Sequence, residues 1–405
     1  MPLELFMAWR YLKAKRKGLF AVLTTAIGIA GVAVGVAALI TTLSVMNGFQ
    51  ADIQKKILGA QAMLTVFRMG DSTSLAAAER TLRDDPQVAA YSPFTLSQAV
   101  ATIGGRSSGV VLKGIDPARE FGVNELAGKL RSGSWQSLRG GKVPGIVLGE
   151  ELARTLGAWP GDNVVLVSPS GLLGAFGVVP RMERFRVAGL LHTGYYEYDS
   201  TTAYSDIASA LKLSGESGAA RGFGVRLHDI AFLRKAKKNL QRSLGGGFFV
   251  RSYEDMNQTL FAALKLEKAT MFIILALIIL VASLNIASTL ILRTVEKTRD
   301  IALLKAMGAG PRLVLRVFLA EGTIIAAIGL TAGITLGLSL CWIIRTYPIV
   351  KLPADIYYLS RLPVDVEPLD VALVTIVGFI LCLLATIYPA WRASKVKTVE
   401  ALHYG

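Results

Sequence analysis

The chain has 405 residues, of which 52% are hydrophobic and 18% are charged, and its mean hydropathy is +0.48. This composition is too apolar for an ordinary soluble protein. A net charge of +15 is typical of nucleic-acid-binding proteins, but here the basic residues flank long apolar runs, which argues against that class. Both cysteines, Cys341 and Cys382, lie inside apolar runs, so we expect small apolar fillers and no disulfide.

Four apolar runs are each long enough to cross a bilayer, which takes roughly 20 helical residues. We assign transmembrane helices to residues 19–47, 268–293, 313–345 and 370–391, because a helix satisfies its own backbone polar groups in lipid. The first run is too long for the apolar core of a signal peptide, and no convincing small-x-small cleavage motif follows it. It is therefore predicted to be an uncleaved first span.

Residues 1–18 are predicted to form an interfacial helix on the cytoplasmic membrane surface, because apolar side chains recur there at helical spacing before a basic cluster. In the first span, Gly31 and Gly35 are four residues apart and would lie on one helix face. Small residues at this spacing let two helices approach closely. We therefore expect this face to pack against a neighbouring helix.

The distribution of Lys and Arg predicts the orientation in the membrane. Residues 1–18, 294–312 and 392–405 are rich in Lys and Arg, and the positive-inside rule places all three segments, and hence both termini, in the cytoplasm. The long segment of residues 48–267 and the short loop of residues 346–369 then lie on the opposite side. Tyrosines in the short loop fit an aromatic belt at the membrane surface, or they line a lateral opening.

Residues 48–267 are predicted to form an extracytoplasmic α+β domain with mixed sheets, because alternating apolar runs typical of strands are interspersed with helical patterns. The helical pattern of the first span continues to about Leu58, and a helix that opens at Ser252 or Tyr253 runs towards the second span. The domain contains no cysteine, but its length allows it to fold around a hydrophobic core alone.

One loop of this domain, between predicted strands that end at Val167 and begin at Phe185, contains mostly apolar side chains between two prolines. Turn loops are normally polar, and exposed apolar patches mark partner sites. The alternative is a longer hairpin whose apolar residues fold back onto the core. The candidate contact residues of this loop are Pro169, Leu172, Leu173, Phe176, Val179, Pro180 and Arg181.

Residues 294–312 are predicted to form a short charged helix between the second and third spans. Ile301, Leu304 and Lys305 fall on one side of this helix. Gly308 stands where the helix would end in a left-handed residue, and Pro311 can open the next helix. A charged helix that carries apolar side chains at a membrane surface is typical of a docking element for another protein. The alternative is an ordinary loop between spans.

Signatures of catalysis are missing from the sequence. It has no G-x-x-x-x-G-K-[ST] phosphate loop, no G-x-S-x-G nucleophile elbow and no metal-ligand spacing among its three histidines. The predicted spans hold no buried acidic or basic side chain, which argues against a proton- or ion-coupled carrier. We therefore expect no catalytic residue, metal or bound cofactor in this chain, and a partner must supply the energy for any work.

Two segments resemble the MacB/FtsX-type superfamily of ABC permeases. The charged helix from Glu296 to Ala309 is similar to the coupling helix of that superfamily, and Tyr388–Ser394 is similar to its C-terminal signature. Three further segments resemble the LolC/LolE family of lipoprotein-releasing permeases, namely Phe6–Leu12, Leu43–Phe49 and Asp355–Tyr358. The resemblance covers essentially the whole chain, although the outer domain is similar in layout more than in residues.

The resemblance implies four transmembrane helices with a large periplasmic α+β domain between the first two, in the bacterial inner membrane. It implies a non-catalytic permease that pairs with a second permease subunit, as a homo- or heterodimer, and with an ABC ATPase dimer that binds ATP and Mg²⁺. Such transporters extract triacylated lipoproteins from the inner membrane and hand them to a periplasmic chaperone for delivery to the outer membrane. Membrane lipids are expected as partners, and nucleic acid is not.

The resemblance also implies three functional sites. The residues expected to couple to the ATPase are Glu296, Lys297, Arg299, Asp300, Leu304, Lys305 and Met307. The apolar loop around Phe176 would bind the chaperone. The residues expected to contact the lipoprotein acyl chains are Met46, Phe49, Ile356, Tyr357 and Tyr358.

Two other functions are compatible with the same superfamily. A MacB-like permease would export peptides or small molecules, and an FtsX-like scaffold would activate an outer hydrolase without moving a substrate. Within the LolC/LolE family, the sequence leaves open a LolC-like, LolE-like or homodimeric hybrid role, the stoichiometry, the sorting signal and the contacts with the chaperone.

Overall fold

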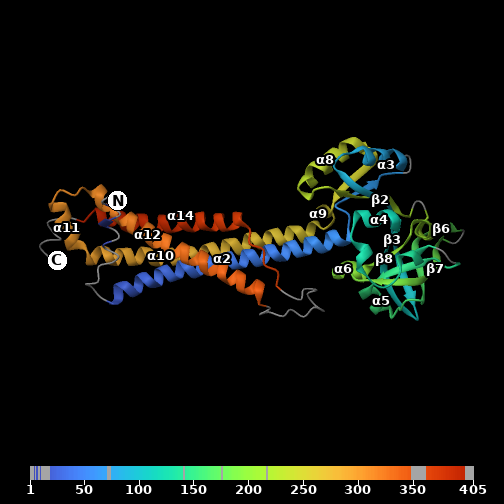
Figure 1. Cartoon of the computed structure of the whole chain (residues 1–405), viewed down its shortest axis with the longest axis horizontal. Coiled ribbons are helices and arrows are strands. Elements are labelled where there is room, and N and C mark those ends of the chain that lie inside the picture. Colours follow the sequence, from blue (N-terminus) through green and yellow to red (C-terminus); the bar gives the residue numbers. More distant parts are fainter. Residues whose placement is uncertain are drawn as a thin grey trace. The chain divides into compact units, whose positions relative to one another are not determined.

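The computed structural model describes residues 4, 6–7, 10, 19–70, 74–139, 142–174, 177–215, 218–347 and 362–396. The chain divides into two compact units. One, the helical unit, comprises Met1–Ala51 and Ala263–Gly405, and the other, the α+β domain, comprises Asp52–Ala262. Figure 1 shows the course of the chain through the elements of both units.

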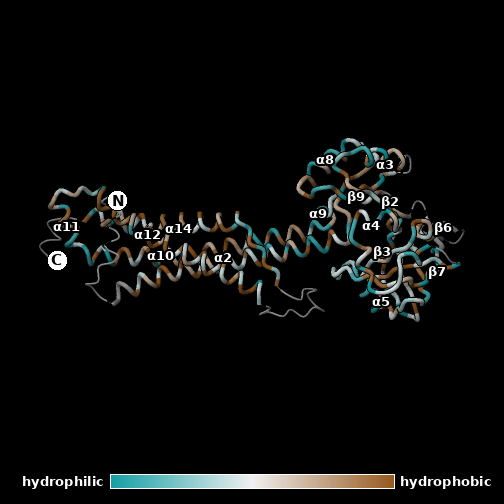
Figure 2. Tube along the Cα trace, viewed as in Figure 1, coloured by the Kyte–Doolittle hydropathy of each residue, from teal (hydrophilic) through white to brown (hydrophobic). Residues whose placement is uncertain are grey.

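Within the part of the chain that the structure describes, four helices are long and apolar enough to cross a membrane. They are α2 (Leu19–Ala60), α10 (Gln258–Glu296), α12 (Pro311–Thr346) and α14 (Pro368–Ser394). Each carries a long apolar stretch, which appears brown in Figure 2. The predicted fold class, four transmembrane helices with an α+β domain between the first two, is thereby confirmed. As expected, α2 continues beyond Leu58, and the chain becomes helical at Tyr253, with one interruption at Asn257 before α10 begins.

Glycines allow α2 to pack closely against two other helices. A Cβ atom added at Gly28, Gly31 or Gly35 would lie 3.1–3.3 Å from side chains of α10, so the predicted packing face is confirmed. On α12, glycines at the same four-residue spacing receive the β-branched side chains of α2. The facing pairs are Gly329 with Val32, Gly333 with Val36, and Gly337 with Ile40.

The core shared by these helices is apolar and contains both cysteines. Cys341 and Cys382 are buried and free, and they pack in one cluster with residues such as Val36, Ile279 and Leu330. This confirms that they act as small apolar fillers.

The α+β domain is built on a mixed sheet of ten strands. The strands are β1 (Leu64–Arg68), β2 (Val88–Ile103), β3 (Arg106–Ile115), β4 (Leu130–Gly133), β5 (Gly145–Gly149), β6 (Asn163–Gly174), β7 (Gly177–Leu191), β8 (Thr202–Asp206), β9 (Ala220–Leu227) and β10 (Phe248–Ser252). Its helices are α3 (Leu75–Asp84), α4 (Pro117–Val123), α5 (Glu150–Leu156), α6 (Tyr196–Thr201), α7 (Ile207–Ser214), α8 (Leu233–Leu244) and α9 (Tyr253–Met256).

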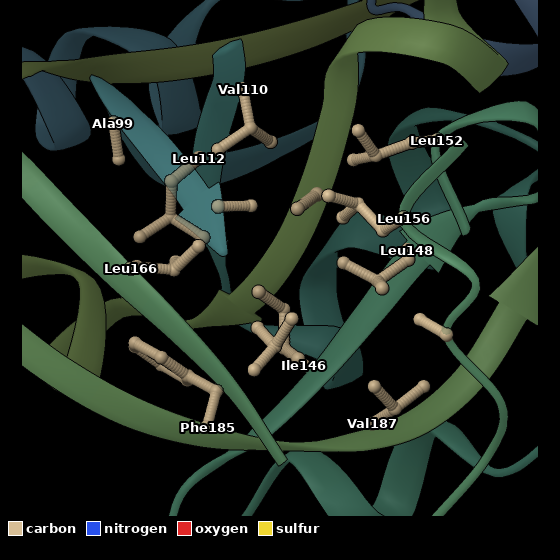
Figure 3. Close-up of a cluster of buried hydrophobic side chains, with 14 of the residues drawn as sticks. Ala99, Val110, Leu112, Ile146, Leu148, Leu152, Leu156, Leu166, Phe185 and Val187 are labelled. Carbon is tan, nitrogen blue, oxygen red and sulfur yellow. The ribbon is translucent and has the colours of Figure 1, made fainter. Parts of the chain in front are cut away.

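Six of these strands close into a barrel, in the order β2-β3-β8-β5-β7-β6 and back to β2. The pairs β3–β8 and β5–β7 are parallel and the others are antiparallel, which confirms the expected mixed sheet. Inward-facing side chains such as Leu112, Leu166 and Phe185 fill the barrel (Figure 3). Closure removes free strand edges, so the barrel can fold without a disulfide.

Of the other strands, β9, β1 and β10 extend the sheet from β2, and β4 pairs with β7 outside the barrel. The apolar side chains of β9, β1 and β10 form a second core with helices α3 and α8, in which Leu82 and Leu240 are fully buried. The domain therefore has a barrel half and a half in which helices cover one sheet face.

A capping box begins α9, the short helix that precedes α10. The backbone N–H of Asp255 donates to Ser252 Oγ at 3.2 Å, and the backbone N–H of Ser252 donates to Asp255 Oδ2 at 2.7 Å. Lys237 Nζ donates to the same carboxylate oxygen at 2.6 Å. Partial burial alone would raise the pKa of the Asp255 carboxyl, but these donors outweigh burial and lower its pKa below the ordinary 3.8.

We expect Asp255→Asn to lower the stability of the domain by about 1 kcal/mol at neutral pH, because the carboxylate holds a cap and the pair with Lys237 is partly exposed to solvent. A carboxyl whose pKa is depressed by folding stabilises the native state above its unfolded pKa, and this contribution is lost as the pH falls through the folded pKa. Thermal unfolding of wild type and variant at several pH values should show the difference at pH 7 and its loss below about pH 4. A difference that grows with acidity would contradict this.

Candidate functional site

The short charged helix between the second and third spans is α11 (Thr298–Ala306). A single residue, Lys297, separates it from α10. Gly308 has a φ of +98°, and Pro311 is the first residue of α12, so both predicted boundary signals are confirmed. The helix is thus held at both ends by membrane-spanning helices and lies at one end of the helical unit (Figure 1).

One face of α11 is anchored in the helical unit. Ile301 is buried and packs in a cluster with Val314, Phe318 and Ala390 of α12 and α14. Leu304 is half-buried and lies near Met7 of the N-terminal segment. Most of the predicted interfacial helix of residues 1–18 lies outside the described residues.

The opposite face of α11 is exposed. Arg299, Leu303 and Met307 recur every four residues, and Met307 is 79% exposed. Glu296 is exposed as well, whereas Lys297 and Asp300 form an ion pair of 2.7 Å. An apolar strip beside charges is the surface expected of a docking helix.

Lys305 has a different position from the one expected for a coupling residue. Its Nζ donates to the carbonyl oxygens of Ser394 and Val396, each at 2.7 Å. The last carbonyls of a helix have no hydrogen-bond partner within the helix. Here Lys305 donates to the carbonyls at the end of α14. Sequence spacing alone could not identify this role, because the two segments are far apart in the chain.

Beside α11, a buried ion pair joins three helices. Arg293 of α10 donates to Glu321 of α12 and, at 2.8 Å, to the Oγ1 atom of Thr25 of α2. The side chains of Arg293 and Glu321 are only 12% and 2% exposed. The prediction that the spans hold no buried charge is therefore wrong at this end: Arg293 is the last residue of the predicted second span, Glu321 lies inside the predicted third span, and helix packing buries both.

At the other end of the helical unit, Asn47 links three helices. Its Nδ2 donates to Asp370 of α14 at 2.7 Å, and its Oδ1 accepts from Lys268 of α10 at 2.8 Å. Lys268 and Asp370 also form an ion pair of 2.9 Å. The next residue, Gly48, lies under the chain at Pro363, whose carbonyl oxygen would be 2.4 Å from an added Cβ. The Asn-Gly pair of the Leu43–Phe49 motif therefore has a structural role: Asn47 links helices through hydrogen bonds, and Gly48 allows close packing.

Of the residues expected to contact the acyl chains, the structure describes two. Met46 and Phe49 flank the Asn-Gly pair on α2 and are half-buried. Ile356, Tyr357 and Tyr358 lie outside the described residues.

The apolar loop predicted between Val167 and Phe185 has the backbone of a hairpin. Strands β6 and β7 pair from Asn163 and Arg186 to Gly174 and Gly177, with a bulge between Ser168 and Leu172. The hairpin alternative therefore describes the backbone. Pro169 and Pro180 are exposed and Arg181 is half-buried. Phe176 lies outside the described residues, and Leu172, Leu173 and Val179 are described by their backbone pairing only.

An exposed apolar row lies at the base of this hairpin, which the sequence analysis did not identify. Val100, Val167 and Met182 are direct cross-strand neighbours on β2, β6 and β7, so their side chains lie on one face. Met182 is 63% exposed and Val100 is 43% exposed. Alternation of apolar residues at 165 and 167 was visible in the sequence, but only the barrel pairing places Val100 beside them.

Two protein families match this chain. Residues 25–242 match the MacB-like periplasmic core domain, and residues 272–398 match the FtsX-like permease C-terminal domain.

Three curated relatives match over almost their whole length. The chain is 36% identical to the lipoprotein-releasing system transmembrane protein LolC of Xylella fastidiosa, an alignment that covers 100% of this chain and 99% of the relative. It is 34% identical to LolC of Neisseria meningitidis and 27% identical to LolE of Haemophilus influenzae, with 99% of each chain covered in both cases.

Proposed function

The chain belongs to the LolC/LolE family of lipoprotein-releasing system transmembrane proteins, non-catalytic permease subunits of ABC transporters, and from this premise we propose that it extracts lipoproteins from the inner membrane for transfer to a periplasmic chaperone. The observation that carries the proposal is the similarity to LolC proteins over the full length of the chain. The architecture supports it, because α10 begins in the α+β domain and ends one residue before α11.

The proposed orientation follows the positive-inside rule. Residues 1–18, 294–312 and 392–405 lie in the cytoplasm, and residues 48–267 and 346–369 lie in the periplasm. The transmembrane segments are residues 19–47, 268–293, 313–345 and 370–391. In this orientation, α11 faces the compartment that supplies ATP, and the α+β domain faces the compartment of the chaperone.

We propose that the energy for transport comes from an ABC ATPase dimer that binds ATP and Mg²⁺ and contacts the exposed face of α11. Arg299, Leu303 and Met307 offer a charge and two apolar side chains on one surface. A second permease subunit completes the transporter. Lipoprotein acyl chains would enter from the outer leaflet beside Met46 and Phe49, with Ile356, Tyr357 and Tyr358 as further contacts.

Reconstitution tests the proposed function. The chain, its second permease subunit and the ATPase are placed in proteoliposomes with a triacylated lipoprotein and the soluble chaperone. Lipoprotein should appear in the soluble fraction only when both ATP and the chaperone are present. Hydrolysis with no lipoprotein release, combined with export of a peptide or activation of a hydrolase, would replace the proposal with one of the other superfamily functions.

The β6–β7 hairpin and the exposed apolar row at its base are proposed as the chaperone-binding surface. We expect Met182→Asp, and separately Pro180→Ala or Phe176→Ala, to weaken chaperone binding about tenfold or more, because a charge or a truncation at an apolar contact removes hot-spot energy of about 1.4 kcal/mol or more. Binding is measured with the purified transporter and the labelled chaperone.

The matched control for this surface is Phe232→Asp, which changes a half-exposed apolar side chain near the start of α8 in the same domain. Its chaperone affinity should equal that of the wild type. Equal losses in Phe232→Asp and Met182→Asp would show that the hairpin surface has no special part in binding.

A further inference from the structure

The buried cluster of Thr25, Arg293 and Glu321 has a place in the fold that suggests a mechanical role. Arg293 lies in the last turn of α10, immediately before Lys297 and α11. Its guanidinium bonds to α12 on one side and to α2 on the other. Arg293 thus links three of the four long helices through polar contacts close to α11.

We propose that this cluster, the inner pin, makes α2, α10 and α12 move as one body when the ATPase displaces α11, and that Arg293 is the positioning residue of this pin. The inference rests on the proposed function only for the source of the displacement. The helix α11 is connected through the chain to α10 and α12, but not to α2. The hydrogen bond from Arg293 to Thr25 therefore gives α2 a polar link to the driven end.

The chemistry of the pin resists separation. Burying a charge is costly, and it is tolerated here because Arg293 Nη1 donates to Glu321 Oε1, so that two opposite buried charges are paired. Pulling either helix away would leave an unpaired charge among apolar side chains. The Thr25 hydroxyl accepts a charge-assisted hydrogen bond. Such a bond depends more strongly on distance and direction than apolar packing does.

A second cluster, the outer pin, joins α2, α10 and α14 near the other border of the apolar layer. It consists of Asn47, Lys268 and Asp370. The helix between Thr25 and Asn47 is about 33 Å long at 1.5 Å per residue, close to the roughly 30 Å thickness of the hydrocarbon core. The two pins therefore hold α2 and α10 together at both borders of the apolar layer, with glycine-mediated packing in between.

The consequence concerns how motion reaches the α+β domain. The chain enters this domain through α2 and leaves it through α10. If the two helices are pinned, both connections receive the same displacement, and the domain moves as a whole. If the two helices are not pinned, α10 can shift while α2 stays in place, and part of the displacement does not reach the domain.

The most selective variant is Thr25→Val, which removes the hydroxyl and leaves the Arg293–Glu321 pair and the side-chain volume in place. In the reconstituted transporter, we expect lipoprotein released per ATP hydrolysed to fall at least threefold, while the ATPase rate stays within twofold of the wild type. Thr25→Ser keeps the hydroxyl and should restore the ratio. The control is Thr41→Val in the same helix, whose hydroxyl donates to the Ala37 carbonyl of its own helix.

A second measurement does not depend on lipoprotein. Spin labels at Leu23→Cys of α2 and Arg312→Cys of α12, both at exposed positions, report the distance between the inner ends of these helices. The native cysteines are buried, so labelling is confined to the introduced ones. The distance distribution should be narrow with and without nucleotide in the wild type, and broader in Thr25→Val.

Two results would overturn the inner pin. One is a distance distribution in Thr25→Val as narrow as in the wild type. The other is an equal decrease of ATPase rate and lipoprotein release, which would indicate general loss of structure. A wild-type transporter that releases no lipoprotein, with the distance result as expected, would refute the proposed function and leave the pin intact.

Discussion

Met307→Asp should reduce ATP-driven lipoprotein release at least tenfold. Met307 is 79% exposed at the end of α11, on the same face as Leu303 and Arg299. An exposed methionine next to a leucine on a held helix is suited to the desolvated centre of an interface. A carboxylate there would have to be buried without a partner when the ATPase docks, at a cost of several kcal/mol.

Arg299→Glu and Lys305→Met separate docking from folding in the same helix. Arg299→Glu should lower the affinity for the ATPase and leave the thermal stability of the isolated chain unchanged, because the side chain is exposed. Lys305→Met should do the reverse, with a loss of about 1–3 kcal/mol, because two carbonyls at the end of α14 lose their donor. Binding of the ATPase and unfolding in detergent are measured for each variant; an ATPase affinity that falls equally in both would contradict the assignment of the exposed face.

Gly48→Ala should prevent stable assembly of the helical unit. The added Cβ would lie 2.4 Å from the Pro363 carbonyl oxygen and 2.5 Å from its carbon, so the main chain of one segment would have to move. Overpacking costs about 1–3 kcal/mol where side chains can adjust, and more where backbone must shift. The displacement would also disturb Asn47, whose side chain joins Lys268 to Asp370.

The control for this change is Gly59→Ala, near the end of the same helix. There the nearest atom, a carboxylate oxygen of Glu125, lies 3.6 Å from the added Cβ, which is an ordinary contact. Gly59→Ala should therefore be neutral or stabilising by up to about 1 kcal/mol, since alanine favours helix. Steady-state membrane levels and thermal unfolding are compared, and equal behaviour of the two variants would show that the Pro363 contact is not tight.

Features that depend on local sequence were predictable. The four apolar helices follow from uninterrupted runs of hydrophobic residues, and the α2 packing face follows from Gly31 and Gly35. The end of α11 follows from Gly308, because only glycine adopts a φ of +98° without strain. In each case the signal and the structure lie within a few residues of each other.

Features that depend on pairing between distant segments were not predictable. Closure of the barrel requires Val100 of β2 to pair with Val167 of β6, and a single sequence contains no signal for that register. The same applies to Arg293 with Glu321 and to Lys305 with the end of α14. The charges were visible as borders of apolar runs, but their burial depends on how the helices pack.

We propose that α11 receives the displacement from the ATPase on one side of the membrane and that the α+β domain acts on the other. Cysteine labelling with a membrane-impermeant reagent tests it in sealed vesicles of known orientation. Met307→Cys and, in the α+β domain, Phe249→Cys place exposed thiols in the two units, and both native cysteines are buried. We expect Met307→Cys to be labelled only from the cytoplasmic face and Phe249→Cys only from the periplasmic face; labelling of both from the same face would contradict this orientation.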